Sequence, residues 1–111
     1  MDTQKLIADW IAAGNQYDTR KYLEFYQNHA ILDDPSVGRK YIGHAEIKDY
    51  FESYFIGYKT QTQLVSLTIE EDLSAHLEVK FTGDFPEGNI GGTFDFVFLE
   101  GKIVHVIANL I

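Results

Sequence analysis

The first half of the chain carries apolar side chains at helical spacing. They predict one helix over residues 3–13, with Trp10 on its apolar face, and a second short helix that begins after Asp18. A third helix is indicated by an aromatic stripe that repeats at three- and four-residue steps between residues 47 and 58. We expect nearly all of the stripe from Ile47 to Phe55 to be buried.

The second half of the chain changes to the two-residue alternation of β-strands. We expect four strands joined by short turns, over residues 61–69, 75–81, 90–99 and 102–110. Another strand, residues 29–34, precedes the third helix and ends at Pro35, because the residue before a proline avoids helix. Successive strands with short connections favour an antiparallel meander. The predicted fold class is therefore α+β, with the helices packed on one face of a curved antiparallel sheet.

Length and composition narrow the classes of function. The 111 residues, 45% of them apolar, fit a single domain over residues 1–111. The net charge of −8 leaves no basic surface for nucleic acid or for an anionic membrane. Cysteine is absent, which excludes disulfides and thiol nucleophiles. The chain also lacks a signal-peptide pattern and a membrane-spanning apolar run, so we expect a cytoplasmic protein.

Three aspartates lie in apolar or strand-end positions and are candidates for acid–base chemistry. Asp33 and Asp34 end the first strand, so their side chains point to opposite faces and one of them must face the helices. Asp95 lies between Phe94 and Phe96, where a charge is costly unless it is paired or faces a cavity. We favour a pocket position for Asp95 over a solvated face. The four histidines are scattered along the chain, so we expect no metal site.

A pocket position for Asp95 has a consequence for the other face of the sheet. Alternation would send Phe94, Phe96 and Phe98 outward, while Val106 on the last strand would face the interior. The outer face would then expose more contiguous apolar surface than monomers usually do. We therefore expect a homodimer that buries this convex face.

The residues resemble the nuclear transport factor 2-like (NTF2-like) superfamily, and within it the SnoaL-like proteins and the ketosteroid isomerases. The resemblance covers nearly the whole chain and rests on Trp10, Asn15, Asp18, Tyr22, Tyr26, Ala30, Asp33-Asp34-Pro35, Tyr41-Ile42-Gly43, residues 47–51 and Gly101-Lys102-Ile103. It implies a cone-shaped, cystatin-like α+β roll. In that fold a strongly curved antiparallel sheet wraps around three N-terminal helices, and a hydrophobic pocket opens between them.

The resemblance also implies roles for single residues. In the isomerases, an aspartate that ends the first strand before a proline is the general base, and Asp34 matches it. A second aspartate, kept protonated by apolar surroundings, donates a hydrogen bond to the developing oxyanion, and Asp95 matches it. The isomerases' tyrosine on the first helix is replaced by Trp10, whose indole N–H is a weaker acid. In SnoaL-like cyclases a pocket aspartate does the acid–base work, a pattern that tolerates Trp10 better.

The predicted function is the binding of a small hydrophobic molecule that bears a carbonyl group. If the protein is an enzyme, it is a cofactor-independent isomerase or polyketide-cyclase type that abstracts a proton, with Asp34 as the base and Asp95 as the acid. The expected binding residues are Trp10, Tyr26, Tyr50, Phe51, Tyr54, Phe55, Val97 and Val106. Two alternatives stay open: a non-catalytic ligand-binding or dimeric interaction module, and an Asp-Arg-Asp epoxide hydrolase arrangement that uses Arg39. No cofactor and no metal ion are expected.

Overall fold

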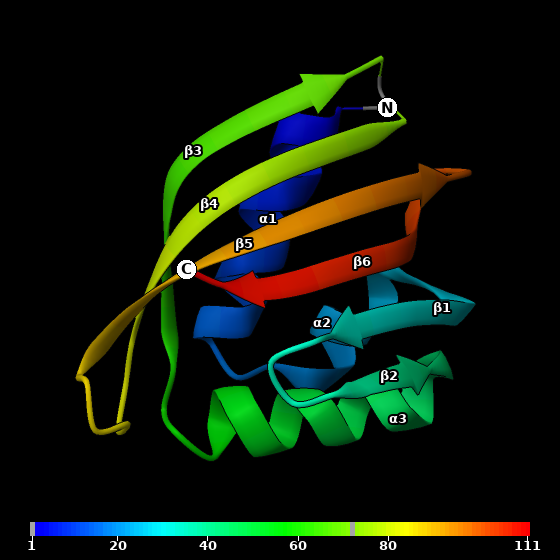
Figure 1. The fold of residues 1–111 in the computed structure, drawn as a ribbon. Coiled ribbons are helices and arrows are strands. Elements are labelled where there is room, and N and C mark those ends of the chain that lie inside the picture. The colour runs from blue at the N-terminus through cyan, green and yellow to red at the C-terminus, as the bar shows by residue number, and fades with distance from the viewer. Residues whose placement is uncertain (1, 72) are drawn as a thin grey trace.

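A computed structural model describes residues 2–71 and 73–111 (Figure 1). Its helices are α1 (Thr3–Asn15), α2 (Thr19–Glu24), α3 (Gly43–Phe51) and the π-helical segment η1 (Glu52–Ile56). Its strands are β1 (Tyr26–Asp34), β2 (Arg39–Ile42), β3 (Gln61–Glu70), β4 (Ser74–Thr82), β5 (Asn89–Leu99) and β6 (Lys102–Leu110). The predicted α+β class is confirmed, and β2 is a short strand that the hydrophobic pattern did not predict. No helix in the described part of the chain is long and apolar enough to cross a membrane.

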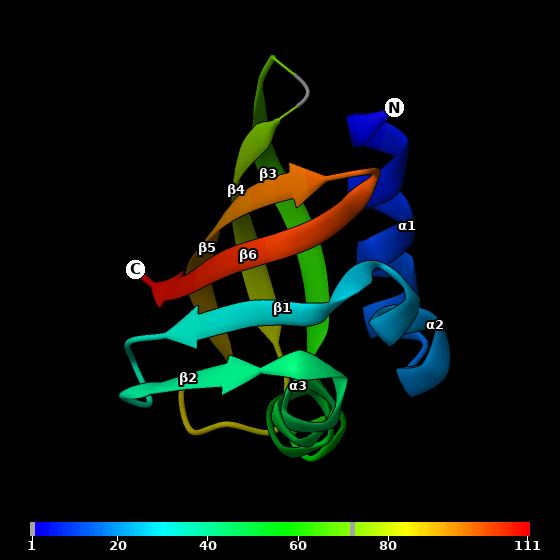
Figure 2. The same cartoon turned by 90° about the vertical axis from the view of Figure 1, so that its right-hand side faces the viewer.

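The six strands form one curved sheet in the order β2-β1-β6-β5-β4-β3 (Figure 2). The strands β3 to β6 form the predicted antiparallel meander. The prediction of a wholly antiparallel sheet is wrong at one place, because β1 and β6 pair in parallel. The tight turn after β1 folds β2 back along one edge of β1. The other edge of β1 pairs with β6, the last strand of the chain.

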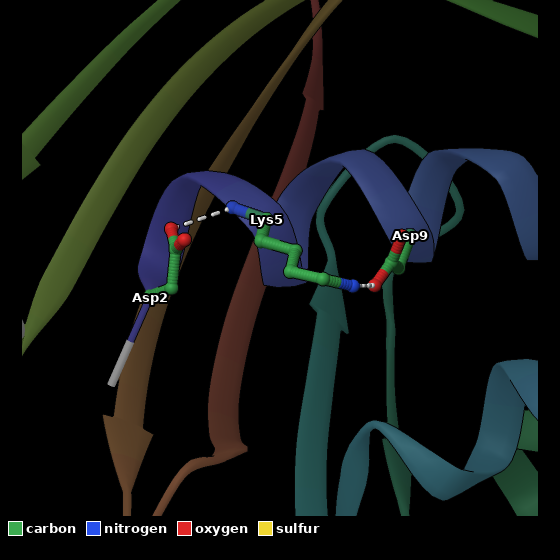
Figure 3. Close-up of polar contacts among 3 residues, drawn as sticks. All are labelled: Asp2, Lys5 and Asp9. Atoms are coloured by element: carbon green, nitrogen blue, oxygen red, sulfur yellow. Dashed lines mark hydrogen bonds and ion pairs between the residues drawn. The ribbon is translucent and has the colours of Figure 1, made fainter.

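Helix α1 begins with a side-chain cap. The carboxylate of Asp2 accepts a hydrogen bond from the backbone N–H of Lys5 at 3.0 Å, which satisfies one of the free N–H groups of the first turn (Figure 3). The ammonium of Lys5 in turn contacts the carboxylate of Asp9 at 2.7 Å, one helical turn further on. These contacts lie on the exposed side of α1, and its opposite side, which carries Ile7 and Trp10, is buried.

The inner face of β5 holds three phenylalanines, which reverses a prediction. Phe94, Phe96 and Phe98 are buried, so the expectation that they point outward is wrong. The ring of Trp10 contacts those of Phe94 and Phe96 edge-on, with centroids 5.0 and 5.1 Å apart. Three aromatic rings bury far more apolar area than Thr93, Asp95 and Val97 on the other face of β5 would. This difference determines which face of the strand turns inward.

The aromatic stripe of the third helix covers the strands β1 and β2. Ile47, Tyr50, Phe51 and Phe55 are buried, as predicted, whereas Tyr54 is 36% exposed. The α-helical part ends at Phe51, and η1 continues the stripe with a wider turn. Figure 2 looks along α3 and shows it beside β2, at the edge of the sheet.

Candidate ligand-binding site

A cavity of about 330 Å³ opens at one end of the sheet. It lies where the β1–β2 turn, the β4–β5 loop (residues 83–88) and the end of β6 approach one another, and both views show these segments on the same side of the molecule (Figures 1 and 2). The apolar lining consists of Tyr50, Tyr54, Phe55, Tyr58, Phe81, Phe85, Val37, Pro86, Ile90 and Leu110. The polar lining consists of Asp34, Ser36, Thr60 and Glu87.

Asp34 is the buried carboxylate of this pocket, with 7% of its surface exposed. It is the last residue of β1, and alternation turns it inward while Asp33 faces the other side, as predicted. Pro35 ends the strand, and the following turn brings the backbone N–H and the hydroxyl of Ser36 to Asp34 Oδ1, at 2.9 and 2.5 Å. These donors offset part of the cost of removing the carboxylate from water.

Tyr50 supplies the third donor to Asp34. Helix α3 places its hydroxyl 2.7 Å from Asp34 Oδ2. Burial raises the pKa of Tyr50 well above its ordinary value, and the negative charge of Asp34 and the hydrogen bond act in the same direction. Tyr50 therefore keeps its proton and stays a hydrogen-bond donor. The carboxylate of Asp34 is thus held in one orientation by three donors at the wall of an apolar pocket.

Asp95 lies outside this pocket, so its predicted position is wrong. Its side chain is on the outer face of β5, about half exposed, and its Oδ1 lies 2.6 Å from Nδ1 of His76 on β4. Strand register places the two residues directly opposite each other. Val97, also predicted to bind the ligand, shares this face and is 44% exposed. The sheet therefore separates Asp95 from Asp34, and the two carboxylates do not share one cavity.

Four further predicted residues belong to the closed core. Trp10 donates its indole N–H to the hydroxyl of Tyr26 at 3.1 Å, and that hydroxyl donates to the hydroxyl of Tyr22 at 2.8 Å. Phe51 stacks on the ring of Tyr22, with centroids 4.1 Å apart. Burial raises the pKa of Tyr26 to about 12. All four of these residues are buried, and none of them lines the pocket. The four are Trp10, Tyr26, Phe51 and Val106.

The structure thus brings Asp34, Tyr50, Tyr54 and Phe55 together from the predicted set. Sequence reasoning missed the β4–β5 loop, which contributes Phe85, Pro86 and Glu87 to the pocket. An aromatic ring next to a proline, inside an otherwise polar loop, is the signal that indicates this contribution. Within the described residues, no group of three or more histidine or carboxylate side chains is placed to hold a metal ion.

Comparison with known proteins identifies the fold. No family model matches the sequence, and no curated protein matches it either. Among solved structures, a candidate polyketide cyclase from Sinorhizobium meliloti is 19% identical, with a TM-score of 0.84, and the match covers 94% of this chain and 93% of that one. A candidate ketosteroid isomerase from Kribbella flavida is 15% identical, with a TM-score of 0.86, over 98% of this chain and 77% of that one.

An NTF2-like protein of unknown function from Cytophaga hutchinsonii shares the same architecture. It is 13% identical, with a TM-score of 0.82, and the match covers all of this chain and 91% of that one. The chain therefore has the NTF2-like fold, which confirms the architecture that the resemblance implied. Identities this low establish the fold, while the chemistry has to be argued from the site.

Proposed function

We propose that the protein binds a small, largely hydrophobic molecule with a carbonyl group, and that Asp34 removes a proton from the carbon next to that carbonyl. The observation that carries this proposal is a carboxylate, buried and oriented by Tyr50 and Ser36, at the wall of an aromatic pocket. The fold neighbours described as a polyketide cyclase and a ketosteroid isomerase support this class of reaction. The ligand-binding residues of the proposal are Asp34, Tyr50, Tyr54 and Phe55.

The proposed step needs a base and a group that stabilises the enolate. Asp34 takes the proton, and the electrons of the C–H bond move to the carbonyl oxygen. Where the ligand carries a C=C bond next to that carbon, the product is a dienolate, and return of the proton to its far end shifts the double bond and completes an isomerisation. In a cyclisation, the enolate instead attacks a second carbonyl of the same molecule, and the resulting alkoxide takes the proton back from Asp34. Because Asp95 lies outside the pocket, the donor to the enolate oxygen would be a phenol of the lining, Tyr54 or Tyr58.

A second function, ligand binding without catalysis, is favoured by one feature of the same carboxylate. Asp34 already accepts three hydrogen bonds, so both of its oxygens are engaged before any ligand arrives. Such a carboxylate can orient a ligand donor through a remaining lone pair without acting as a base. The pocket would then serve as a ligand-binding module, and its ligand would be released unchanged.

Deuterium exchange separates the two functions. We expect the protein to accelerate the exchange of the α-protons of 1-tetralone in deuterium oxide, followed by proton NMR. Asp34→Asn should abolish the acceleration and retain binding, and Asp95→Asn on the outer face is the matched control that should retain both. Equal exchange with Asp34→Asn would overturn the role of Asp34 as the base. Binding of the ketone at the pocket without exchange in the unmodified protein would establish the non-catalytic function.

The outer face of the sheet supports a further part of the proposal, a homodimer. The predicted outward phenylalanines do not form this interface, because Phe94, Phe96 and Phe98 are buried. Strand register nevertheless aligns Ile42, Ile31, His105 and Val97 in one row across four neighbouring strands. Sedimentation should show a dimer at micromolar concentration that Val97→Glu converts to a monomer. A monomer before substitution, or a dimer unaffected by it, would refute this interface.

A further inference from the structure

The mouth of the pocket is formed by aromatic rings that remain accessible. Tyr54 and Tyr58 are 36% and 41% exposed and lie nearly parallel, with centroids 6.4 Å apart. Phe85 from the β4–β5 loop lies beside Tyr58 at 6.3 Å, with the planes inclined by 53°. The face of an aromatic ring carries a negative electrostatic potential, which attracts cations. All three rings belong to the lining of the pocket.

The charges of the pocket have one sign only. Asp34 lies on the inner wall and Glu87 on the exposed β4–β5 loop, and none of the described residues that line the pocket is a lysine, arginine or histidine. Arg39, next to the β1–β2 turn, is engaged elsewhere, because its guanidinium lies 4.3 Å from the centre of the Tyr41 ring and 3.7 Å from the carboxylate of Glu46. An anionic ligand would therefore meet two like charges, and the net charge of −8 adds to this repulsion.

The two carboxylates differ in how well they are satisfied. Asp34 accepts hydrogen bonds from Ser36 and Tyr50, whereas Glu87 is exposed and has no ion-pair partner in the described part of the chain. From the aromatic mouth and this unpaired carboxylate, we infer that the pocket selects ligands with a positively charged nitrogen, such as protonated or quaternary amines. Glu87 is the counter-ion, the rings of Tyr58 and Phe85 contact the carbons attached to the nitrogen, and the hydrocarbon body fills the inner pocket.

This inference rests on the ligand site proposed above but not on any reaction at Asp34. Three probes with the same body test it: 4-phenylbutylamine, 4-phenylbutanol and 4-phenylbutanoate, titrated at pH 7 into the isotope-labelled protein. We expect the amine to bind about fivefold more tightly than the alcohol and the carboxylate to bind most weakly. The shifted NMR signals should come from residues of the pocket lining.

Substitutions place the effect at the mouth. Glu87→Gln and Tyr58→Leu should each bring the ratio of amine to alcohol affinity close to one, and this ratio within each variant is the quantity that is compared. Glu24→Gln on α2 removes the same charge away from the pocket, and it should leave the ratio unchanged.

Each outcome decides the inference. Equal affinity for the amine and the alcohol, or tightest binding of the carboxylate, would overturn it while the ligand site itself stands. A preference for the amine that survives both mouth substitutions would also overturn it. If no probe shifts a pocket residue at millimolar concentration, both the inference and the proposed ligand site are wrong. Failure of the ketone exchange alone leaves the preference for amines unaffected.

Discussion

Asp34 and Asp95 lie on opposite faces of the same sheet. Asp34 is buried and accepts hydrogen bonds from the neutral donors Tyr50 and Ser36 at the wall of a pocket. Asp95 is half exposed on the outer face of the sheet, contacts the imidazole of His76, and does not line the pocket that holds Asp34. The first carboxylate is fixed in orientation by three hydrogen-bond donors, and the second belongs to a half-exposed surface pair.

The difference shows that apolar neighbours in the sequence do not make a carboxylate buried. Asp95 stands between two buried phenylalanines, and alternation turns it away from the interior for that very reason. Asp34 is flanked by Asp33 and Pro35, a more polar context, yet it is the one that faces the helices. Substitutions on each face should therefore differ in their effect on stability.

The largest effect is expected from the two faces of β5. Phe94→Ala removes a buried ring that contacts Trp10, and it should lower the free energy of unfolding by about 3–5 kcal/mol. Leu99→Ala on the outer face of the same strand lies outside the row proposed for the dimer, so it is the matched control and should cost less than about 1 kcal/mol. Urea unfolding followed by circular dichroism measures both. Equal losses would contradict the assignment of the inner face.

Alkaline pH should destabilise the inner face through its buried phenols. Burial raises the pKa of Tyr26 from 10.0 to about 12, so below pH 10 both the folded and the unfolded chain hold this proton. As the pH rises from 10 to 12, the unfolded chain loses the proton first, and stability falls by roughly 3 kcal/mol for this residue. Tyr22 and Tyr50 are shifted in the same direction and steepen the fall.

Tyr26→Phe should reduce this loss of stability. The variant costs stability at pH 7, because Trp10 loses the acceptor of its N–H group, but its stability should fall less between pH 10 and pH 12. Urea unfolding at a series of pH values gives both quantities. If the free energy of unfolding falls equally steeply above pH 10 with and without Tyr26→Phe, the phenol of Tyr26 titrates as if it were exposed.

Removing each carboxylate should have unequal effects on stability. Asp34→Ala leaves the buried hydroxyl of Tyr50 without its acceptor and should cost about 1–3 kcal/mol, while Asp95→Ala should cost less than about 1 kcal/mol. Adding Tyr50→Phe to Asp34→Ala should restore part of the loss, because the unsatisfied donor is then gone. If Asp95→Ala is the more damaging substitution in thermal unfolding, the contrast between the two aspartates is refuted.

The smallest effect concerns the pair on the outer face. In the Val97→Glu background, which should be monomeric, a double-mutant cycle of His76→Ala and Asp95→Ala should give a coupling free energy below about 1 kcal/mol, because both side chains are about half exposed in the single chain. The coupling should decrease further at high salt. A coupling of several kcal/mol that salt does not change would indicate that the pair is covered, as a dimer through this face would cover it.

Particular residues show how far sequence reasoning reached into the site. Asp34 could be placed from the strand that ends at Pro35, and Tyr50, Tyr54 and Phe55 from the stripe of the third helix. Trp10 was expected in the pocket and lies in the core, because Tyr26 accepts its N–H group there. The β4–β5 loop was recognised only as a loop, and its approach to the pocket depends on the curvature of strands that are distant in sequence.

By itself, the sequence determined the local elements of this protein and the class of its fold. Hydrophobic periodicity is a property of neighbouring residues, so it places the helices, the meander and the two alternating faces of each strand. Tertiary structure decided which face turns inward, because burying Phe94, Phe96 and Phe98 is a gain that exists only when the helices pack against them. It also decided the parallel pairing of β1 with β6 and the aromatic mouth around Glu87, since both join segments far apart in the chain.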